Sequence, residues 1–171
     1  LCNAYVLEAT SFSLGIKRLR WKDHRNMSMR GEDVLAFELG PKNNRLKILK
    51  AEVKSRAAMS TAVIGDARVA LSANSELPSP HALAFVADRS HQTGDTILGD
   101  ALDKAQLEDG IRPSQVSHML FTFSGNNPVK LLKTNLQAYS GSVPQHYVGL
   151  HVQGHQDFIK AVFAAIGKVG K

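Results

Sequence analysis

Three charged side chains in the first third of the sequence have the types and spacing of a cation-dependent hydrolytic site. Asp33 is followed, after 18 residues, by Glu52, and Lys54 lies two positions further on. Residues two apart on a strand share a face, so Glu52 and Lys54 are expected to project together. Carboxylates from adjacent strands, with the Val53 carbonyl, suit a hard cation such as Mg²⁺ or Mn²⁺. Such a cation polarises a phosphodiester and activates water, and a lysine beside it can orient that water or stabilise developing charge.

Two further carboxylates lie close to this set in the sequence. Residues 3–13 are expected to form a helix in which Glu8 is four residues from both Ala4 and Phe12. Glu8 therefore falls on their apolar stripe, where a carboxylate either extends into solvent or faces a site. Glu32 directly precedes Asp33, and the residues alone leave open which of these two would be the metal ligand.

A β-hairpin is the element that would bring the three side chains together. Residues 31–39 contain a continuous apolar run that predicts a strand buried on both faces. Residues 45–55 alternate, and residues 40–44 between them have the composition of a turn. One face of the second strand would carry Leu49, Ala51 and Val53, and the other Leu46, Ile48, Lys50, Glu52 and Lys54.

The remaining patterns predict helices packed on a mixed sheet. Helices are expected at residues 57–73, 82–90, 95–107 and 156–166, and further strands at residues 16–21, 116–123 and 147–152. Residues 129–139 are assigned to neither class. This order predicts an α/β (α+β) fold with a central mixed β-sheet flanked by helices. The length, and the start at Leu1, predict a single domain over residues 1–171 that is a fragment of a longer chain.

The charge of +6 is confined to one part of the chain. Residues 1–60 hold twelve Lys or Arg and six Asp or Glu, whereas residues 61–171 hold nine of each. A basic segment is either a solvated face or a surface that follows phosphates, and its proximity to the carboxylate set favours DNA as partner. The side chains expected to contact nucleic acid are Lys17, Arg18, Arg20, Lys47 and Arg56.

Several classes of protein and site are disfavoured. Apolar runs are far shorter than the roughly 20 residues of a membrane helix, and the start has no signal-peptide pattern. We therefore expect no membrane partner. Cys2 is the one cysteine, so an internal disulfide is excluded. His151 and His155 have helical metal-ligand spacing, but the alternation around them favours a strand.

Asp33, the 18-residue gap, and Glu52-Val53-Lys54 on a hairpin followed by a helix resemble the PD-(D/E)xK nuclease superfamily. Within it, residues 50–56 and the preceding Gly-Glu-Asp look like the nuclease subunit of the Hachiman antiphage defence system. The resemblance implies a restriction-endonuclease-like core, with Asp33, Glu52, Lys54 and Glu8 as catalytic residues and Asp33 and Glu52 as ligands. It also implies Mg²⁺-dependent DNA hydrolysis, a helicase partner, and a cytoplasmic role in antiviral defence. The chain departs from the superfamily pattern because Glu32, not Pro, precedes Asp33.

Two other functions compete with a nuclease. A degenerate nuclease fold could bind nucleic acid without cleaving it, and in that case the three side chains need not share one site. An assembly module would dock a partner through its C-terminal two-thirds, which predicts an exposed apolar patch beyond a few hundred Å². A third interpretation takes Lys50, Glu52 and Lys54 as alternating charges on a solvated strand edge.

Overall fold

A computed structural model of the chain describes residues 1–16, 22–24, 27–28, 31–40 and 45–169. Short helical segments of π and 3₁₀ type lie at Ala105–Asp109 and Pro113–Gln115. The helices are α1 (Cys2–Ala9), α2 (Thr61–Ser72), α3 (Pro80–Thr93), α4 (Thr96–Lys104), α5 (Val129–Gln137) and α6 (His155–Val169). The strands are β1 (Ser13–Leu14), β2 (Lys22–His24), β3 (Met27–Ser28), β4 (Val34–Leu39), β5 (Leu46–Arg56), β6 (Val116–Ser124) and β7 (Gln145–His151).

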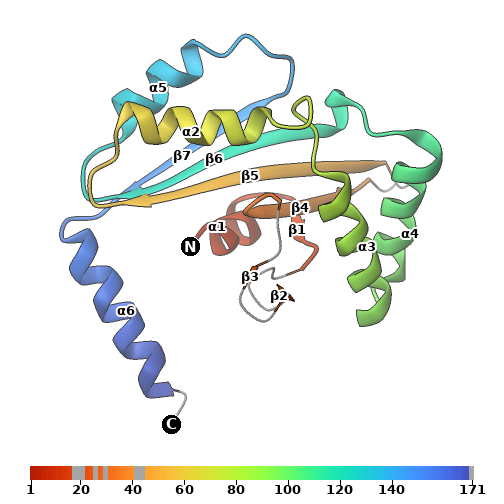
Figure 1. Cartoon of the computed structure of the whole chain (residues 1–171), viewed down its shortest axis with the longest axis horizontal. Helices are drawn as coiled ribbons and strands as arrows, with labels where there is room; N and C mark the ends of the chain where they lie inside the picture. The colour runs from red at the N-terminus through yellow and green to blue at the C-terminus, as the bar shows by residue number, and fades with distance from the viewer. Residues whose placement is uncertain (17–21, 25–26, 29–30, 41–44, 170–171) are drawn as a thin grey trace.

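A five-stranded mixed sheet in the order β1-β4-β5-β6-β7 forms the centre of the molecule (Figure 1). β4 and β5 are the antiparallel hairpin expected from the sequence, with Val34 opposite Ala51 and Leu39 opposite Leu46. β5, β6 and β7 run parallel, so their carboxyl ends meet at one end of the sheet. β2 and β3 form a separate two-stranded ribbon. The predicted α/β architecture with a mixed central sheet is confirmed.

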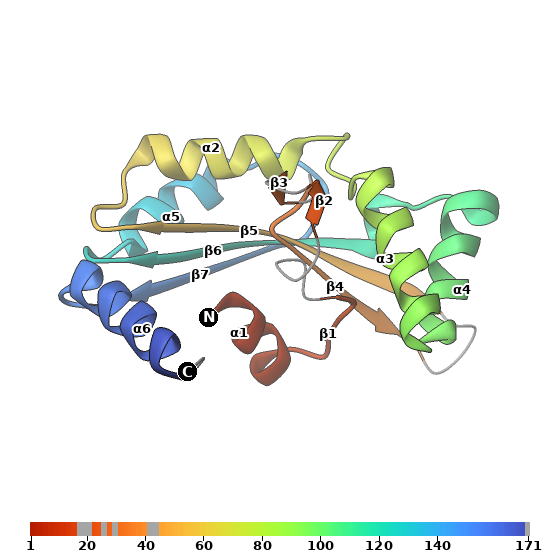
Figure 2. The same ribbon diagram turned by 60° about the horizontal axis from the view of Figure 1, so that its bottom comes forward.

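The alternation along β5 assigns different helices to the two faces of the sheet (Figure 2). On one face Leu49 and Ala51 pack against Cys2 and Val6 of α1. On the other face Ile48 belongs to a cluster with residues of α3 and α4. A third cluster joins α2 and α5 to Leu120 of β6, on that second face. The second face, which also carries Glu52 and Lys54, is therefore the one beneath α2 to α5.

Local sequence signals explain where the helices begin and end. The Ser60 hydroxyl accepts from the Val63 N–H, so α2 begins at residue 61 and not at 57. Ser79 caps α3 in the same way, with a proline in the first turn. Gly94 ends α3 in the left-handed conformation, at φ 87°.

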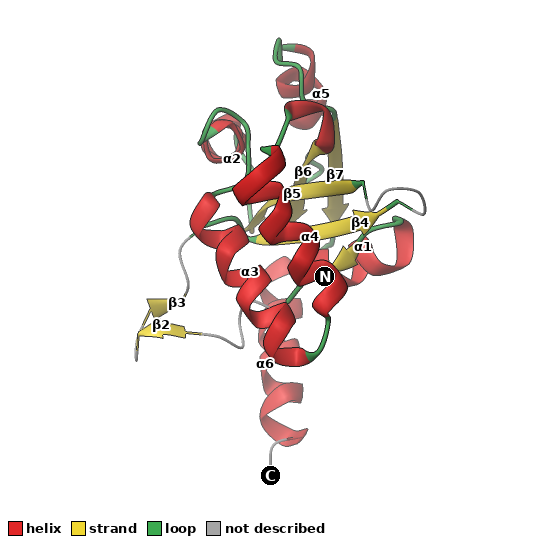
Figure 3. Ribbon diagram, turned by 90° about the vertical axis from the view of Figure 1, so that its right-hand side faces the viewer, coloured by secondary structure: helices red, strands yellow, loops and turns green. Residues whose placement is uncertain are grey.

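The structure completes or alters some of the elements expected from the sequence. Residues 129–139, left unassigned, contain helix α5. The strand expected at residues 16–21 lies outside the described residues except for Ile16, which is not in a strand. α6 extends away from the sheet (Figure 3) and exposes Phe158, Val162, Phe163 and Ile166. No helix in the described part of the chain combines the length and apolar character needed to cross a membrane.

Candidate active site

The candidate site lies where β5 continues beyond the end of its neighbour β4. The ladder between the two strands ends at the Val34–Ala51 pair. The next backbone N–H of β5 on this edge, that of Val53, donates to Asp33 Oδ2 at 2.8 Å. The side chain of Asp33 therefore replaces the missing strand partner, and its position in the register is opposite Glu52.

Glu52 and Lys54 form a half-buried ion pair on the face beneath α2. Lys54 Nζ lies 2.7 Å from Glu52 Oε1, and the Lys54 and Glu52 side chains are 22% and 14% exposed. Burial raises the pKa of the Glu52 carboxyl, the hydrogen bond from Lys54 lowers it, and the nearby Asp33 charge raises it further. The Val53 N–H that holds Asp33 belongs to the residue directly after Glu52, so the two carboxylates lie near one another at the same edge of β5.

The donor atoms at this edge have the chemistry of a hard-cation site. Asp33 Oδ2 is held by the Val53 amide, which leaves Oδ1 as its second acceptor. The N–H and C=O of one strand residue point to the same edge, so the Val53 carbonyl also faces this opening. No group of three or more His, Cys, Asp or Glu that could hold a metal occurs among the described residues. The donor set is therefore two carboxylates and a carbonyl, which fits Mg²⁺ because this ion keeps several of its waters.

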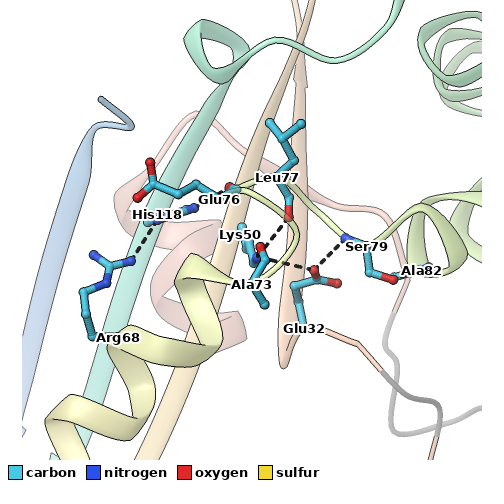
Figure 4. A network of polar contacts seen from close by, with 9 residues as sticks. All are labelled: Glu32, Lys50, Arg68, Ala73, Glu76, Leu77, Ser79, Ala82 and His118. Carbon is cyan, nitrogen blue, oxygen red and sulfur yellow. Dashed lines mark hydrogen bonds and ion pairs between the residues drawn. The ribbon is translucent and has the colours of Figure 1, made fainter. Parts of the chain in front are cut away.

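Glu32, the alternative ligand, faces the protein interior instead (Figure 4). Its Oε1 accepts from the Ser79 N–H at 2.7 Å and lies 3.8 Å from Lys50 Nζ. Lys50 is 2% exposed and donates to the Ala73 and Leu77 carbonyls at 3.0 and 2.9 Å. Because Glu32 is buried in this network and Asp33 lies at the open edge, the geometry favours Asp33 as the ligand.

The same network continues to β6 through His118, which the register places beside Lys50. His118 is fully buried, and burial lowers its pKa from 6.5 to about 4. Its neutral ring donates from Nε2 to the Glu76 carbonyl at 2.8 Å, and Nδ1 accepts from Arg68 at 3.0 Å. Burial also lowers the pKa of Lys50. These buried groups connect the loop after α2 to the strand that carries Glu52.

Of the other predicted site residues, the three that the structure describes come from different parts of the fold. Glu8 is exposed on α1, which covers the face opposite Glu52, and the structure does not bring it to the other carboxylates. Lys47 pairs with Glu38 at 2.8 Å near the far end of β5. Arg56 is exposed at the end of β5, two residues beyond Lys54. Lys17, Arg18 and Arg20 lie outside the described residues.

The histidines at residues 151 and 155 do not form a helical metal pair. His151 ends β7 and contacts the Gly125 carbonyl at 3.0 Å. His155 begins α6, where its Nε2 lies 3.0 Å from Ser55 Oγ and its ring packs on Phe123. The preference for a strand before His151 is thus confirmed, and His155 anchors α6 to the end of β5.

The family model for HamA matches residues 2–166. The chain belongs to the HamA family. This membership supports a role in antiphage defence and confirms the resemblance to the nuclease subunit of the Hachiman system. The match extends over the whole sheet and into α6, well beyond the hairpin that carries the motif. No curated protein matches the chain.

Proposed function

We propose that this HamA-family chain is a metal-dependent nuclease of PD-(D/E)xK type that hydrolyses phosphodiester bonds of DNA. The observation that carries the proposal is the convergence of Asp33, Glu52 and Lys54 at the open edge of β5. A structural ion pair alone would not require Asp33 to occupy the position opposite Glu52. Membership of a defence family supports the same conclusion.

The roles of the residues follow from their positions. Asp33 Oδ1, a Glu52 carboxylate oxygen and the Val53 carbonyl would hold Mg²⁺ or Mn²⁺, which supplies Lewis-acid activation of water and of the phosphodiester. The Val53 amide fixes the Asp33 carboxylate in place before any cation binds. Lys54, held at 2.7 Å by Glu52, orients the attacking water and stabilises the negative charge that develops on the phosphoryl oxygens.

Cleavage assays with the protein, alone and together with the helicase partner proposed below, test this proposal. DNA should be nicked or degraded with Mg²⁺ or Mn²⁺, and a chelator should stop the reaction. Restoring the metal should restore cleavage. An absence of cleavage of single- and double-stranded DNA and RNA with both metals would refute the catalytic function and favour a non-catalytic nucleic-acid-binding module.

We also propose a helicase subunit as partner, because α6 presents the kind of surface that assembly requires. Phe163 and Ile166 are 70% and 63% exposed, and Phe158 and Val162 are each 39% exposed. These side chains lie on a helix that extends from the sheet, where exposed apolar residues mark interaction surfaces. Co-purification with the helicase should be lost in a Phe163→Glu, Ile166→Glu variant. Retention of the complex would exclude α6 as the docking element.

A further inference from the structure

Acidic residues are absent from a long stretch of the second half of the chain. No Asp or Glu occurs between Asp109 and Asp157, whereas this stretch contains Arg112, Lys130 and Lys133. By contrast, residues 61–109 hold eight acids and three bases. The equal totals for residues 61–171 therefore conceal a separation of charge. The acids are concentrated on α3, α4 and the segment after them, and the acid-free stretch forms β6, α5 and β7.

The acidic helices α3 and α4 and the acid-free helix α5 lie at opposite ends of the molecule (Figures 1 and 2). α3 and α4 pack at the end where β5 begins, against Leu46 and Ile48. α5 starts at the other end, close to where β5 and β6 finish. A nucleic acid at the carboxyl ends of the parallel strands would therefore lie close to the start of α5 and far from the acidic helices α3 and α4.

The outer face of α5 has the composition of a phosphate-binding surface. A hollow of about 600 Å³ follows this face. α5 contains no acidic residue, and its lysines form no ion pair among the described residues. The nearest helix, α2, contributes one acid, the exposed Asp66. The hollow is lined by Asn127, Val129, Lys130, Lys133, Thr134 and Gln137.

Hydrogen bonds between two short loops, the one after β5 and the one before α5, connect the end of β5 to the start of α5. The Gly125 N–H donates to the Arg56 and Ala57 carbonyls at 3.3 and 3.1 Å. The Asn126 side chain accepts from the Met59 N–H at 2.6 Å and donates to its carbonyl at 3.0 Å. Arg56 and the first turn of α5 are therefore held in a fixed relation at one end of the sheet.

We propose that the outer face of α5, through Lys130 and Lys133, binds the phosphate backbone of DNA that continues from the site past Arg56. This inference rests on the proposed nuclease function and adds the path that the bound DNA follows beyond the site. Exposed lysines beside hydroxyl and amide groups position a backbone without reading its sequence. The α5 contacts should therefore be independent of sequence and sensitive to salt.

A pair of charge-matched variants tests the inference by fluorescence anisotropy. The test variant combines Lys130→Gln with Lys133→Gln. The control variant combines Lys104→Gln with Lys160→Gln, two exposed lysines that lie near Asp109 and Asp157. Each variant therefore loses two exposed lysine charges. Both pairs are made in a Glu52→Gln background, which prevents cleavage, and labelled DNA of increasing length is titrated over a series of salt concentrations. Glutamine preserves helix propensity, so circular dichroism should show an unchanged fold.

The α5 variant should bind long duplex DNA on the order of tenfold more weakly. The slope of log K against log salt should become less steep by about 1.8, since each phosphate contact contributes about 0.9. The shortest DNA that still binds should be unaffected, and so should the control pair. Equal losses in both pairs, or no loss in the α5 pair, would overturn the inference while leaving the nuclease proposal intact. Failure of the unsubstituted protein, with Glu52 intact, to bind or cleave any DNA would instead refute the proposed function, and with it this inference.

Discussion

Replacing Glu52 by Gln should abolish cleavage while leaving the fold and DNA binding largely unchanged. The amide preserves the shape of the side chain and can still accept a hydrogen bond from Lys54, which is 2.7 Å away. It removes the negative charge that a divalent cation requires at this position. Binding of DNA should be retained or slightly strengthened, because one carboxylate no longer repels phosphate.

The expected effects on rate and on stability differ greatly in size. Losing the ligand should raise the barrier by about 4 kcal/mol or more, which is roughly a thousandfold in rate. The half-buried ion pair with Lys54 is expected to contribute within about 1 kcal/mol to folding. Removing the carboxylate also removes the burial cost that raises its pKa, which offsets part of the lost pairing.

The hairpin offers a matched control in the more exposed Glu–Lys pair at its other end. Lys47 Nζ lies 2.8 Å from Glu38 Oε1 at the other end of β5. Glu38→Gln therefore makes the same chemical change in the same type of contact, and it should retain full activity. Metal-dependent cleavage, DNA affinity and denaturant unfolding are measured for both variants. Full activity in Glu52→Gln, or an equal loss in Glu38→Gln, would show that the site has been placed incorrectly.

Three further predictions follow from the site and its surroundings. Lys54→Ala should reduce the cleavage rate about as much as Glu52→Gln does. It should also weaken DNA binding in anisotropy titrations, because it deletes a positive charge. Unchanged kinetics would exclude Lys54 from the site. The lowered pKa of His118 means that, between pH 6.5 and about 4, the unfolded chain binds a proton that the folded protein does not. Stability should therefore fall as pH decreases through this window, by about 3 kcal/mol in total. Unfolding titrations at several pH values should show a flatter dependence for His118→Asn, and equal slopes would contradict this account. Glutamine substitutions at Lys17, Arg18 and Arg20 in the N-terminal basic segment should weaken DNA binding and reduce its salt dependence. Unchanged affinity would identify this segment as a solvated face.

The hairpin and its motif could be predicted because period-two alternation determines which side chains share a face. Lys50, Glu52 and Lys54 were expected on one face of a strand, and they lie on one face of β5. Alternation does not determine what covers that face. Lys50 resembles a solvated lysine in sequence, yet it is 2% exposed because the carbonyls of the loop after α2 enclose its ammonium group.

Other features depend on contacts between distant parts of the chain and have no local signal. The strand expected from residue 31 starts at Val34, because the side chains of Glu32 and Asp33 bind the Ser79 and Val53 amides. Helix α5 was left unassigned because its buried face is short, with Leu132 as its one buried residue. Ser55 and His155, one hundred residues apart, meet only because β6 and β7 place α6 beside the end of β5.

The buried contact between Glu32 and Lys50 also affects how the hairpin selects its register. A slip of two residues would leave the hydrophobic alternation of β4 and β5 intact, so the apolar pattern alone does not exclude it. A slip in one direction would bring Glu52 to the place of Lys50, where a second carboxylate would face Glu32 in a buried environment. A slip in the other direction would put Ile48 there and leave Glu32 without the lysine ammonium group. Either arrangement buries an unpaired charge, which is costly. Among these three registers, only the observed one places a lysine beside Glu32, and it is also the one that sets Asp33 opposite Glu52.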